Sequence, residues 1–195
     1  GNVIASTEQM IEKINYVLKT KKNAVVNIVN DKLTLSVFAL LEQNLKNVKE
    51  INFVIRDTKF VPEKNEISHE FEMAPTDILY NSYDIVEKNK LKHFSKAKAM
   101  HDFIKANVNV KKANPKVKIG GNIIIIDDDF MIQGSSSLEV TLKKSRNAFR
   151  NINFDTMLNG TMDKEQILSA LNTFNQIWFN EQVSSDYKED LLQSL

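Results

Sequence analysis

The sequence predicts an α/β fold in which helices alternate with the strands of a partly parallel sheet. Within the first 55 residues, two helical apolar patterns alternate with two short apolar runs, an order typical of α/β domains. Beyond residue 116 the apolar pattern changes to short strands, two of which are separated by an aspartate triplet. A length of 195 residues, with 42% hydrophobic and 26% charged residues, indicates a single globular domain over residues 1–195.

Local signals place the elements along the chain. Ser6 and Gln9 form a capping-box pattern before a helix that should end near residues 19–23. Further strands are predicted at 24–29, 51–55, 117–119, 122–127, 130–133 and 153–158. Further helices are predicted at 33–45, 90–106, 138–148 and 163–180. Residues 57–88 show little periodicity and are expected to form a loop with short helices.

Charge is distributed unevenly although the net charge is only +1. Residues 57–87 carry eight acidic residues and two lysines, whereas residues 88–118 carry ten lysines and one aspartate. A basic segment of this kind is either a polyanion-binding face or a solvated surface, and the sequence leaves both open.

The absence of cysteine and of a signal-like N-terminus predicts a cytoplasmic protein. The longest apolar run, at 123–126, is too short to cross a membrane. Residues 1–6 are interpreted as a leader that includes a residue left by a tag.

Residues 120–137 contain the motif most informative about function. Their spacing resembles the phospholipase D-like superfamily signature, which reads His-x-Lys, four residues, Asp, six residues, then Gly-Ser and usually Asn. The corresponding positions here are Gly120, Asn122, Asp127, Gly134, Ser135 and Ser137. The resemblance implies a mixed sheet flanked by helices on both faces.

The substitutions in this motif remove the chemistry that the resemblance implies. In that superfamily one histidine attacks phosphorus, a second protonates the leaving group, and lysines stabilise phosphate charge. Gly120 has no side chain, and Asn122 could donate a hydrogen bond to a phosphate oxygen but carries no charge. None of His69, His93 and His101 is followed two residues later by lysine. We therefore expect a degenerate site with no catalytic residue, metal or cofactor.

A wider resemblance is to the N-terminal domain found ahead of Swi/Snf-type (superfamily 2) helicases in bacteria and their mobile elements. It rests on four stretches in order, at 38–61, 89–111, 130–138 and 174–178. The resemblance implies a phospholipase D-like domain without an intact catalytic motif, followed in an ATP-dependent parent protein by a helicase region. Residues 181–195 would lead toward that region, and no Gly-x-x-x-x-Gly-Lys-Ser/Thr loop occurs in this chain.

Two groups of basic residues are candidate nucleic-acid contacts. They are Lys111, Lys112, Lys116 and Lys118 before the motif, and Lys143, Lys144, Arg146 and Arg150 after it. The alternative for the first group is an edge strand that lysines protect from aggregation, and for the second a solvated helix face.

Other polar and aromatic patterns have structural explanations that we favour. Residues 135–137 could cradle a phosphate, but a polar turn at a strand end explains them. A hairpin turn explains the triplet at 127–129 better than a metal site does. Phe174, Trp178 and Phe179 could stack on bases, but an amphipathic helix more simply places them in the core.

The sequence therefore predicts a non-catalytic nucleic-acid-binding or regulatory N-terminal domain of a bacterial helicase, with DNA and the downstream helicase region as partners. Two alternatives stay open: a phosphodiesterase or nuclease with unorthodox residues, active alone or as a homodimer, and a protein-interaction or dimerisation module.

Overall fold

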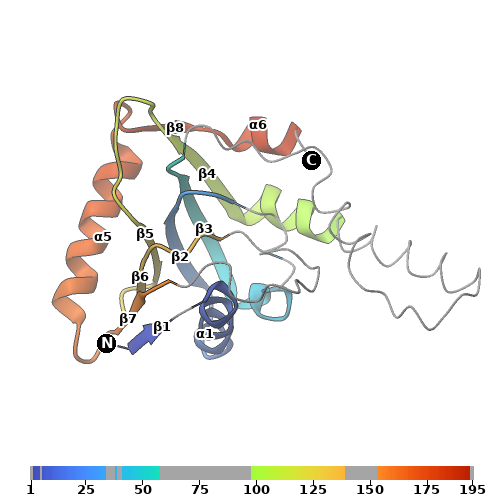
Figure 1. Cartoon of the computed structure of the whole chain (residues 1–195). Helices are drawn as coiled ribbons and strands as arrows, with labels where there is room; N and C mark the ends of the chain where they lie inside the picture. Colours follow the sequence, from blue (N-terminus) through green and yellow to red (C-terminus); the bar gives the residue numbers. More distant parts are fainter. Residues whose placement is uncertain are drawn as a thin grey trace, which may run out of the picture.

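The computed structural model describes residues 2–4, 6–33, 38, 41–57, 98–138 and 153–193. Its centre is an eight-stranded sheet with the strand order β1-β7-β6-β5-β2-β3-β4-β8 (Figure 1). The neighbours β2, β3 and β4 run parallel, and every other neighbouring pair in the sheet is antiparallel. This arrangement confirms the predicted α/β class.

The element bounds follow the chain. The strands are β1 (Asn2–Ile4), β2 (Ala24–Asn30), β3 (Val48–Ile55), β4 (Val108–Ala113), β5 (Asn122–Ile126), β6 (Phe130–Gly134), β7 (Asp155–Asn159) and β8 (Ser184–Asp186). The helices are α1 (Thr7–Lys19), the 3-10 helix η1 (Glu42–Asn47), α5 (Lys164–Phe179) and α6 (Lys188–Gln193), and residues 98–107 are also helical.

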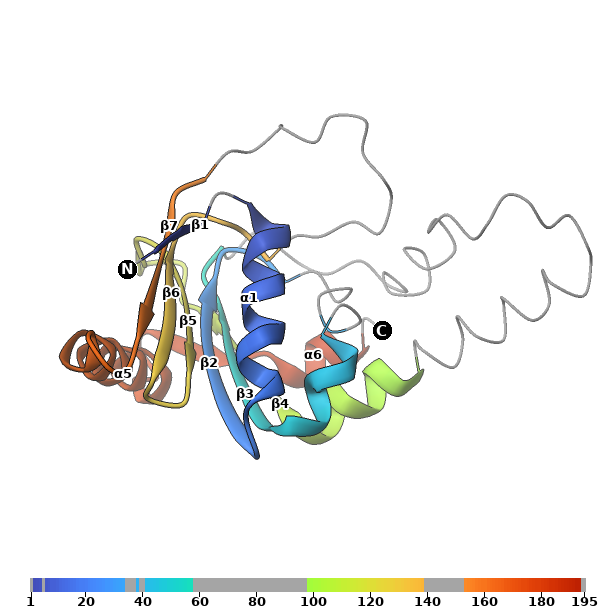
Figure 2. The same ribbon diagram turned by 90° about the horizontal axis from the view of Figure 1, so that it is seen from below.

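Helices cover both faces of the sheet, as predicted. Figure 2 shows α1 and α5 on opposite sides of it. One core contains apolar residues of α1, η1, residues 98–107 and α6, including Met10, Leu45, Ile104 and Leu191. The second core lies under α5, whose Ile167 and Phe174 pack with Val29, Ile125 and Met131. Because both faces of the central strands are buried, the apolar residues of β2 and β5 follow one another instead of alternating with polar ones, and the sequence is interrupted only by Asn27 and Asn30 in β2 and by Asn122 at the start of β5.

The first helix begins where its capping residue predicts. The Ser6 side chain accepts a hydrogen bond from the backbone N–H of Gln9 at 3.2 Å, which satisfies one of the unpaired donors of the first turn. The prediction that Phe174 and Trp178 pack inward is confirmed, since Phe174 is buried in the second core and Trp178, partly buried, packs against that core and stacks on Phe174 with ring centroids 5.8 Å apart. Phe179, in contrast, is 75% exposed.

The aspartate triplet forms the turn between β5 and β6, as predicted. Asp127 adopts a left-handed conformation with φ of 51° and accepts a hydrogen bond from the Val25 N–H at 2.8 Å. Lys21 lies 2.6 Å from a carboxylate oxygen of Asp129 and 3.3 Å from one of Asp127. Lys164 pairs with Asp128 at 2.8 Å and thereby connects α5 to the same turn.

These ion pairs shift the pKa values of the groups involved. Partial burial disfavours the charge on Lys21, but the hydrogen bonds and charges of Asp129 and Asp127 outweigh it and raise the Lys21 pKa. The hydrogen bond and positive charge of Lys164 hold the Asp128 pKa below its usual value.

Several predictions of secondary structure from the sequence were wrong. Residues 117–119 are not a strand, and the strand before Pro115 is β4, which the sequence analysis did not predict. Leu33 does not begin a helix but forms an isolated bridge with Leu138, which likewise does not begin one. The short edge strands β1 and β8 were also not predicted.

Other predictions lie outside the described residues. They concern 58–97, most of the helix predicted at 138–148, and parts of the helix predicted at 33–45. Across the ranges that the structure does describe, no helix combines the length and apolar character needed to cross a membrane.

The Lys21 ion pairs predict a measurable contribution to stability. Lys21→Ala is expected to lower the free energy of unfolding by about 1 kcal/mol, the upper end for surface ion pairs, because the amine contacts two carboxylates. Since folding raises the Lys21 pKa, this contribution is fully present below about pH 10 and is lost as the pH rises through the folded-state pKa. Urea denaturation at pH 7 and at alkaline pH measures both effects. The exposed neighbour Lys22 is the control, and an equal effect of Lys22→Ala would contradict this account.

Candidate functional site

One edge of the sheet brings together the residues of the degenerate motif. The parallel strands β2 and β3 end at this edge, and so does β6, while the antiparallel strands β5 and β7 begin there. Ligands of α/β proteins commonly bind outside the carboxyl ends of parallel strands. The edge therefore defines the candidate site, and Asn122, the first residue of β5, lies at its centre.

All hydrogen-bonding groups of the Asn122 side chain are used within the protein. Its Oδ1 accepts from the Asp31 backbone N–H at 3.0 Å and from Arg56 Nε at 2.7 Å. Its Nδ2 donates to Asp31 Oδ1 and to the Ser136 carbonyl, both at 3.1 Å. An asparagine side chain offers two donors and two acceptor sites, so these four bonds satisfy it. Asn122 is only 5% exposed.

This arrangement corrects one expectation from the sequence. The sequence left open that the Asn122 amide could donate to a phosphate oxygen, but both of its N–H groups donate to acceptors in the chain. The lysine position of the motif is therefore filled by a structural residue. A ligand could engage Asn122 only by displacing bonds inside a buried network, which is costly.

Arg56 and Asp31 place opposite charges on either side of Asn122. Arg56 follows β3 and also donates to the Ile119 carbonyl at 3.4 Å, while Asp31 follows β2 and accepts from the Ser137 hydroxyl at 2.7 Å. The cluster thus holds a cation in place of the missing lysine, but a carboxylate lies within the same network. The attraction that Arg56 exerts on a phosphate is accordingly reduced.

The Gly-Ser segment is fixed by a buried carboxylate. Asp155 is 1% exposed and accepts hydrogen bonds from both the backbone N–H and the hydroxyl of Ser136. Ser135 donates to Asn153 at 3.1 Å. The three serine hydroxyls of the segment therefore donate to acceptors within the chain, which is the geometry of a polar turn.

Two glycines of the motif differ sharply in their surroundings. A Cβ atom on Gly134 would lie 2.1 Å from Asp155 Oδ1, so only glycine fits beside the buried carboxylate. A Cβ atom on Gly120 would meet nothing within 4 Å. The histidine position is therefore open space and not a position where glycine is sterically required.

Asp127 does not belong to this site. It follows the last residue of β5, whereas Asn122 is the first, and a five-residue strand separates its ends by roughly 15 Å. Its bonds to Val25 and Lys21 stabilise the turn. Of the motif positions, Gly120, Asn122, Gly134, Ser135 and Ser137 share the edge, and Asp127 holds the opposite end of the hairpin.

The predicted basic residues fall into three groups. Lys111 donates to the Trp178 carbonyl at 2.7 Å and lies over the Trp178 ring, and Lys112 lies over the Tyr187 ring at 5.4 Å. Lys116 and Lys118 are exposed in the non-strand segment that leads to Gly120. Lys143, Lys144, Arg146 and Arg150 lie outside the described residues.

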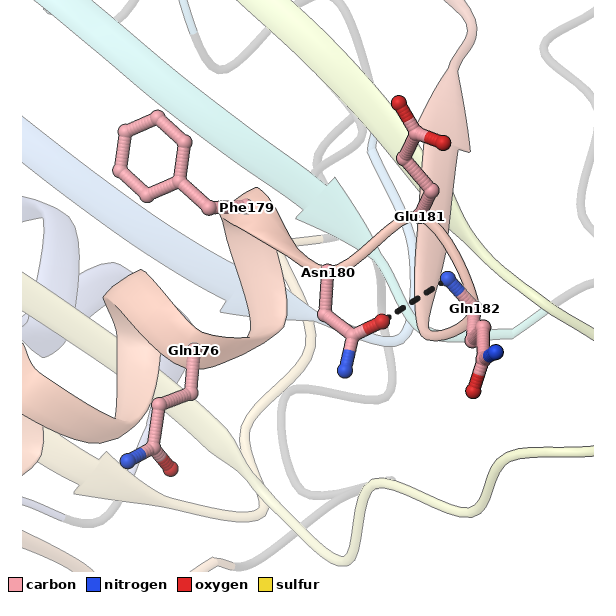
Figure 3. A pocket seen from close by; sticks show the side chains of 5 residues that line it. All are labelled: Gln176, Phe179, Asn180, Glu181 and Gln182. Atoms are coloured by element: carbon pink, nitrogen blue, oxygen red, sulfur yellow. Dashed lines mark hydrogen bonds between the residues drawn. The ribbon is translucent and has the colours of Figure 1, made fainter.

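An open cleft of about 560 Å³ adjoins the site on the α5 side of the sheet. Gly120, Gly121 and Gly134 line one part of it, and Phe174 and Ile177 of α5 line another. A separate hollow at the C-terminal end of α5 contains Phe179, where Asn180 accepts a hydrogen bond from the Gln182 N–H (Figure 3). That hollow shares no residue with the motif.

Sequence reasoning missed the residues that reach the site from elsewhere in the chain. Arg56, Asp31 and Asp155 follow or begin strands far apart in sequence, and only the parallel pairing of β2 with β3 brings the first two together. A polar residue directly after a buried strand was the available signal. Among the described residues, no three His, Asp or Glu side chains gather in a way that could hold a metal ion.

The two glycines give a matched stability prediction. Gly134→Ala is expected to lower the free energy of unfolding by about 1–3 kcal/mol, because the new methyl group would displace the Asp155 carboxylate. Gly120→Ala is expected to change it by less than about 0.5 kcal/mol, because the added Cβ meets open space. Urea denaturation of both variants measures the difference, and equal losses would contradict the described geometry.

Comparisons with known proteins agree with this geometry at the level of the fold. No family model and no curated protein sequence matches the chain. Among solved structures, NucT from Helicobacter pylori is similar with a TM-score of 0.48 and 15% identity, covering 93% of this chain and 96% of that chain. Nuc from Salmonella typhimurium, a phospholipase D family member, is similar with a TM-score of 0.50 and 11% identity, covering 95% of this chain and 97% of that chain. The chain thus has a phospholipase D-like fold.

Proposed function

We propose that this chain is a non-catalytic, phospholipase D-like domain that binds the phosphate backbone of DNA, as the N-terminal part of a bacterial ATP-dependent helicase. The observation that carries the non-catalytic part is the complete internal hydrogen bonding of Asn122 at the lysine position. The helicase context rests on the sequence resemblance of residues 38–61, 89–111, 130–138 and 174–178.

The lack of a side chain at the histidine position of the motif supports the same proposal. A histidine is required to attack phosphorus in the superfamily that the motif resembles, and Gly120 provides no side chain at that position. The buried Asn122 amide provides neither charge nor a free donor for the developing phosphate charge. Binding without turnover is what such a site can still perform.

Exposed lysines beside the site support a backbone-binding role. Lys118 is exposed two residues before Gly120, and Lys116 is exposed in the same segment. Lysines that neutralise phosphates release condensed counterions, so binding weakens with salt and is independent of sequence. Lys111 and Lys112 are engaged with Trp178 and Tyr187, and we assign them a smaller part in binding.

The test is the fluorescence anisotropy of labelled DNA at two salt concentrations. We expect binding that weakens by at least about tenfold when salt rises from about 50 mM to about 200 mM. Lys116→Glu combined with Lys118→Glu should weaken binding further and reduce the salt dependence, because two phosphate contacts are lost.

The matched control changes the same amount of charge elsewhere. Lys13 on α1 and Lys22 in the following turn are both exposed, and Lys22 precedes β2 at the end of that strand opposite the site. Lys13→Glu combined with Lys22→Glu should have a much smaller effect than the first double variant. If the two double variants weaken binding equally, net charge rather than this segment determines the affinity.

A phosphodiesterase activity is the second candidate, because the motif keeps its spacing and the sheet edge keeps its Gly-Ser segment. Our proposal predicts that the chain does not hydrolyse bis(p-nitrophenyl) phosphate above the buffer rate. The measurement is release of p-nitrophenol, with Ser135→Ala as the control for contaminating enzymes. Turnover that disappears in Ser135→Ala would contradict the non-catalytic assignment.

A further inference from the structure

The cleft beside Gly120 has a lining that suits an uncharged, planar ligand. Its volume of about 560 Å³ lies within the range of roughly 300–1,000 Å³ found for small-molecule sites. In the part of the chain that the structure describes, the residues that line it are apolar or carry neutral polar groups. A phosphate or carboxylate would find no cation in this lining, whereas an aromatic heterocycle would find apolar walls and neutral hydrogen-bonding groups.

The floor of the cleft carries a row of side chains across three strands. Ile123 of β5 pairs with Gln133 of β6, and Gln133 pairs with Thr156 of β7. All three are partly exposed and line the cleft. Within the described ranges the Gln133 amide has no hydrogen-bond partner. A primary amide presents a donor beside an acceptor, and this pair matches the hydrogen-bonding edge of a nucleobase.

An aromatic side chain in the wall of the cleft is exposed to solvent. Phe154, immediately before β7, is 78% exposed and lines the cleft together with Gln133. A large apolar side chain left in water costs free energy that a bound ligand recovers. Exposed aromatic rings are the common platform on which proteins stack the bases of single strands.

We infer that the cleft takes up one unpaired nucleobase of a single-stranded nucleic acid, stacked on Phe154 and hydrogen-bonded to Gln133. The inference rests on the proposed DNA-binding function. It adds that the bound nucleic acid is single-stranded and that the protein contacts one base as well as the phosphate backbone. Lys118 and the Gly120–Gly121 backbone lie beside the cleft, so a phosphate held there places its own base within reach of the lining. A base inside a duplex is paired and stacked, and it cannot enter without being flipped out.

The experiment compares nucleic acids of equal length that differ in whether an unpaired base is present. Labelled oligothymidylate, an abasic strand of the same length and a duplex of the same length are titrated with the full chain. We expect oligothymidylate to bind more tightly than either of the others. Phe154→Ala should weaken oligothymidylate binding by about 5-fold to 150-fold, the range for loss of one stacked base, and should leave abasic-strand binding unchanged.

Phe179→Ala is the matched control, because Phe179 is 75% exposed but lies in the separate hollow at the end of α5. Its effect should stay within about twofold, as for a surface substitution away from the ligand. If the abasic strand and oligothymidylate bind equally, or if the two phenylalanine variants behave alike, the inference is overturned while backbone binding stands. Absence of binding by every strand overturns the proposed function as well. Displacement of the strand by thymidine monophosphate at equal nucleotide concentration would assign the cleft to free nucleotides instead.

Discussion

The four hydrogen bonds of the Asn122 side chain are the constraint on which the site depends. They join the start of β5 to the segments that follow β2, β3 and β6, so three separate parts of the chain meet at one buried amide. A lysine at this position would bring a charge into a space that is 5% exposed and already holds Arg56. Buried polar groups of this kind are stable only when fully paired, and here they are.

The residues of the motif that stabilise the fold are different from the positions that would carry reacting groups. The Gly-Ser segment keeps its glycine because Asp155 occupies the space of a side chain at Gly134, and the hairpin keeps Asp127 because that residue holds the turn. The two positions that would carry reacting groups hold an open glycine and a committed amide. What the edge still offers a ligand is exposed lysine charge, backbone groups and an uncharged cleft.

The sequence correctly predicted the elements that depend on interactions between neighbouring residues. The Ser6 cap, the aspartate turn and the amphipathic α5 each depend on a few neighbouring residues, and all three are confirmed. β4 was missed because its lysines resemble solvated residues, although they lie over the Trp178 and Tyr187 rings. Most positions of the motif lie at one edge of the sheet, and Arg56, Asp31 and Asp155 reach that edge only through the strand order. The hydrogen bonds of the Asn122 amide could not be predicted from the sequence either, because its partners are brought to it by tertiary contacts.

The most direct test of the structural role of Asn122 is a two-dimensional NMR titration of the labelled chain with single-stranded DNA. The account predicts that the Asn122 side-chain amide protons exchange slowly with solvent and keep their chemical shifts as DNA is added. The backbone amides of Lys118, Gly120 and Gly121 should shift in the same titration. Rapid exchange of the Asn122 amide protons without DNA would show that the buried hydrogen bonds do not hold them. A large shift of these protons on DNA binding would show that the ligand disturbs the network, and either result would contradict the account.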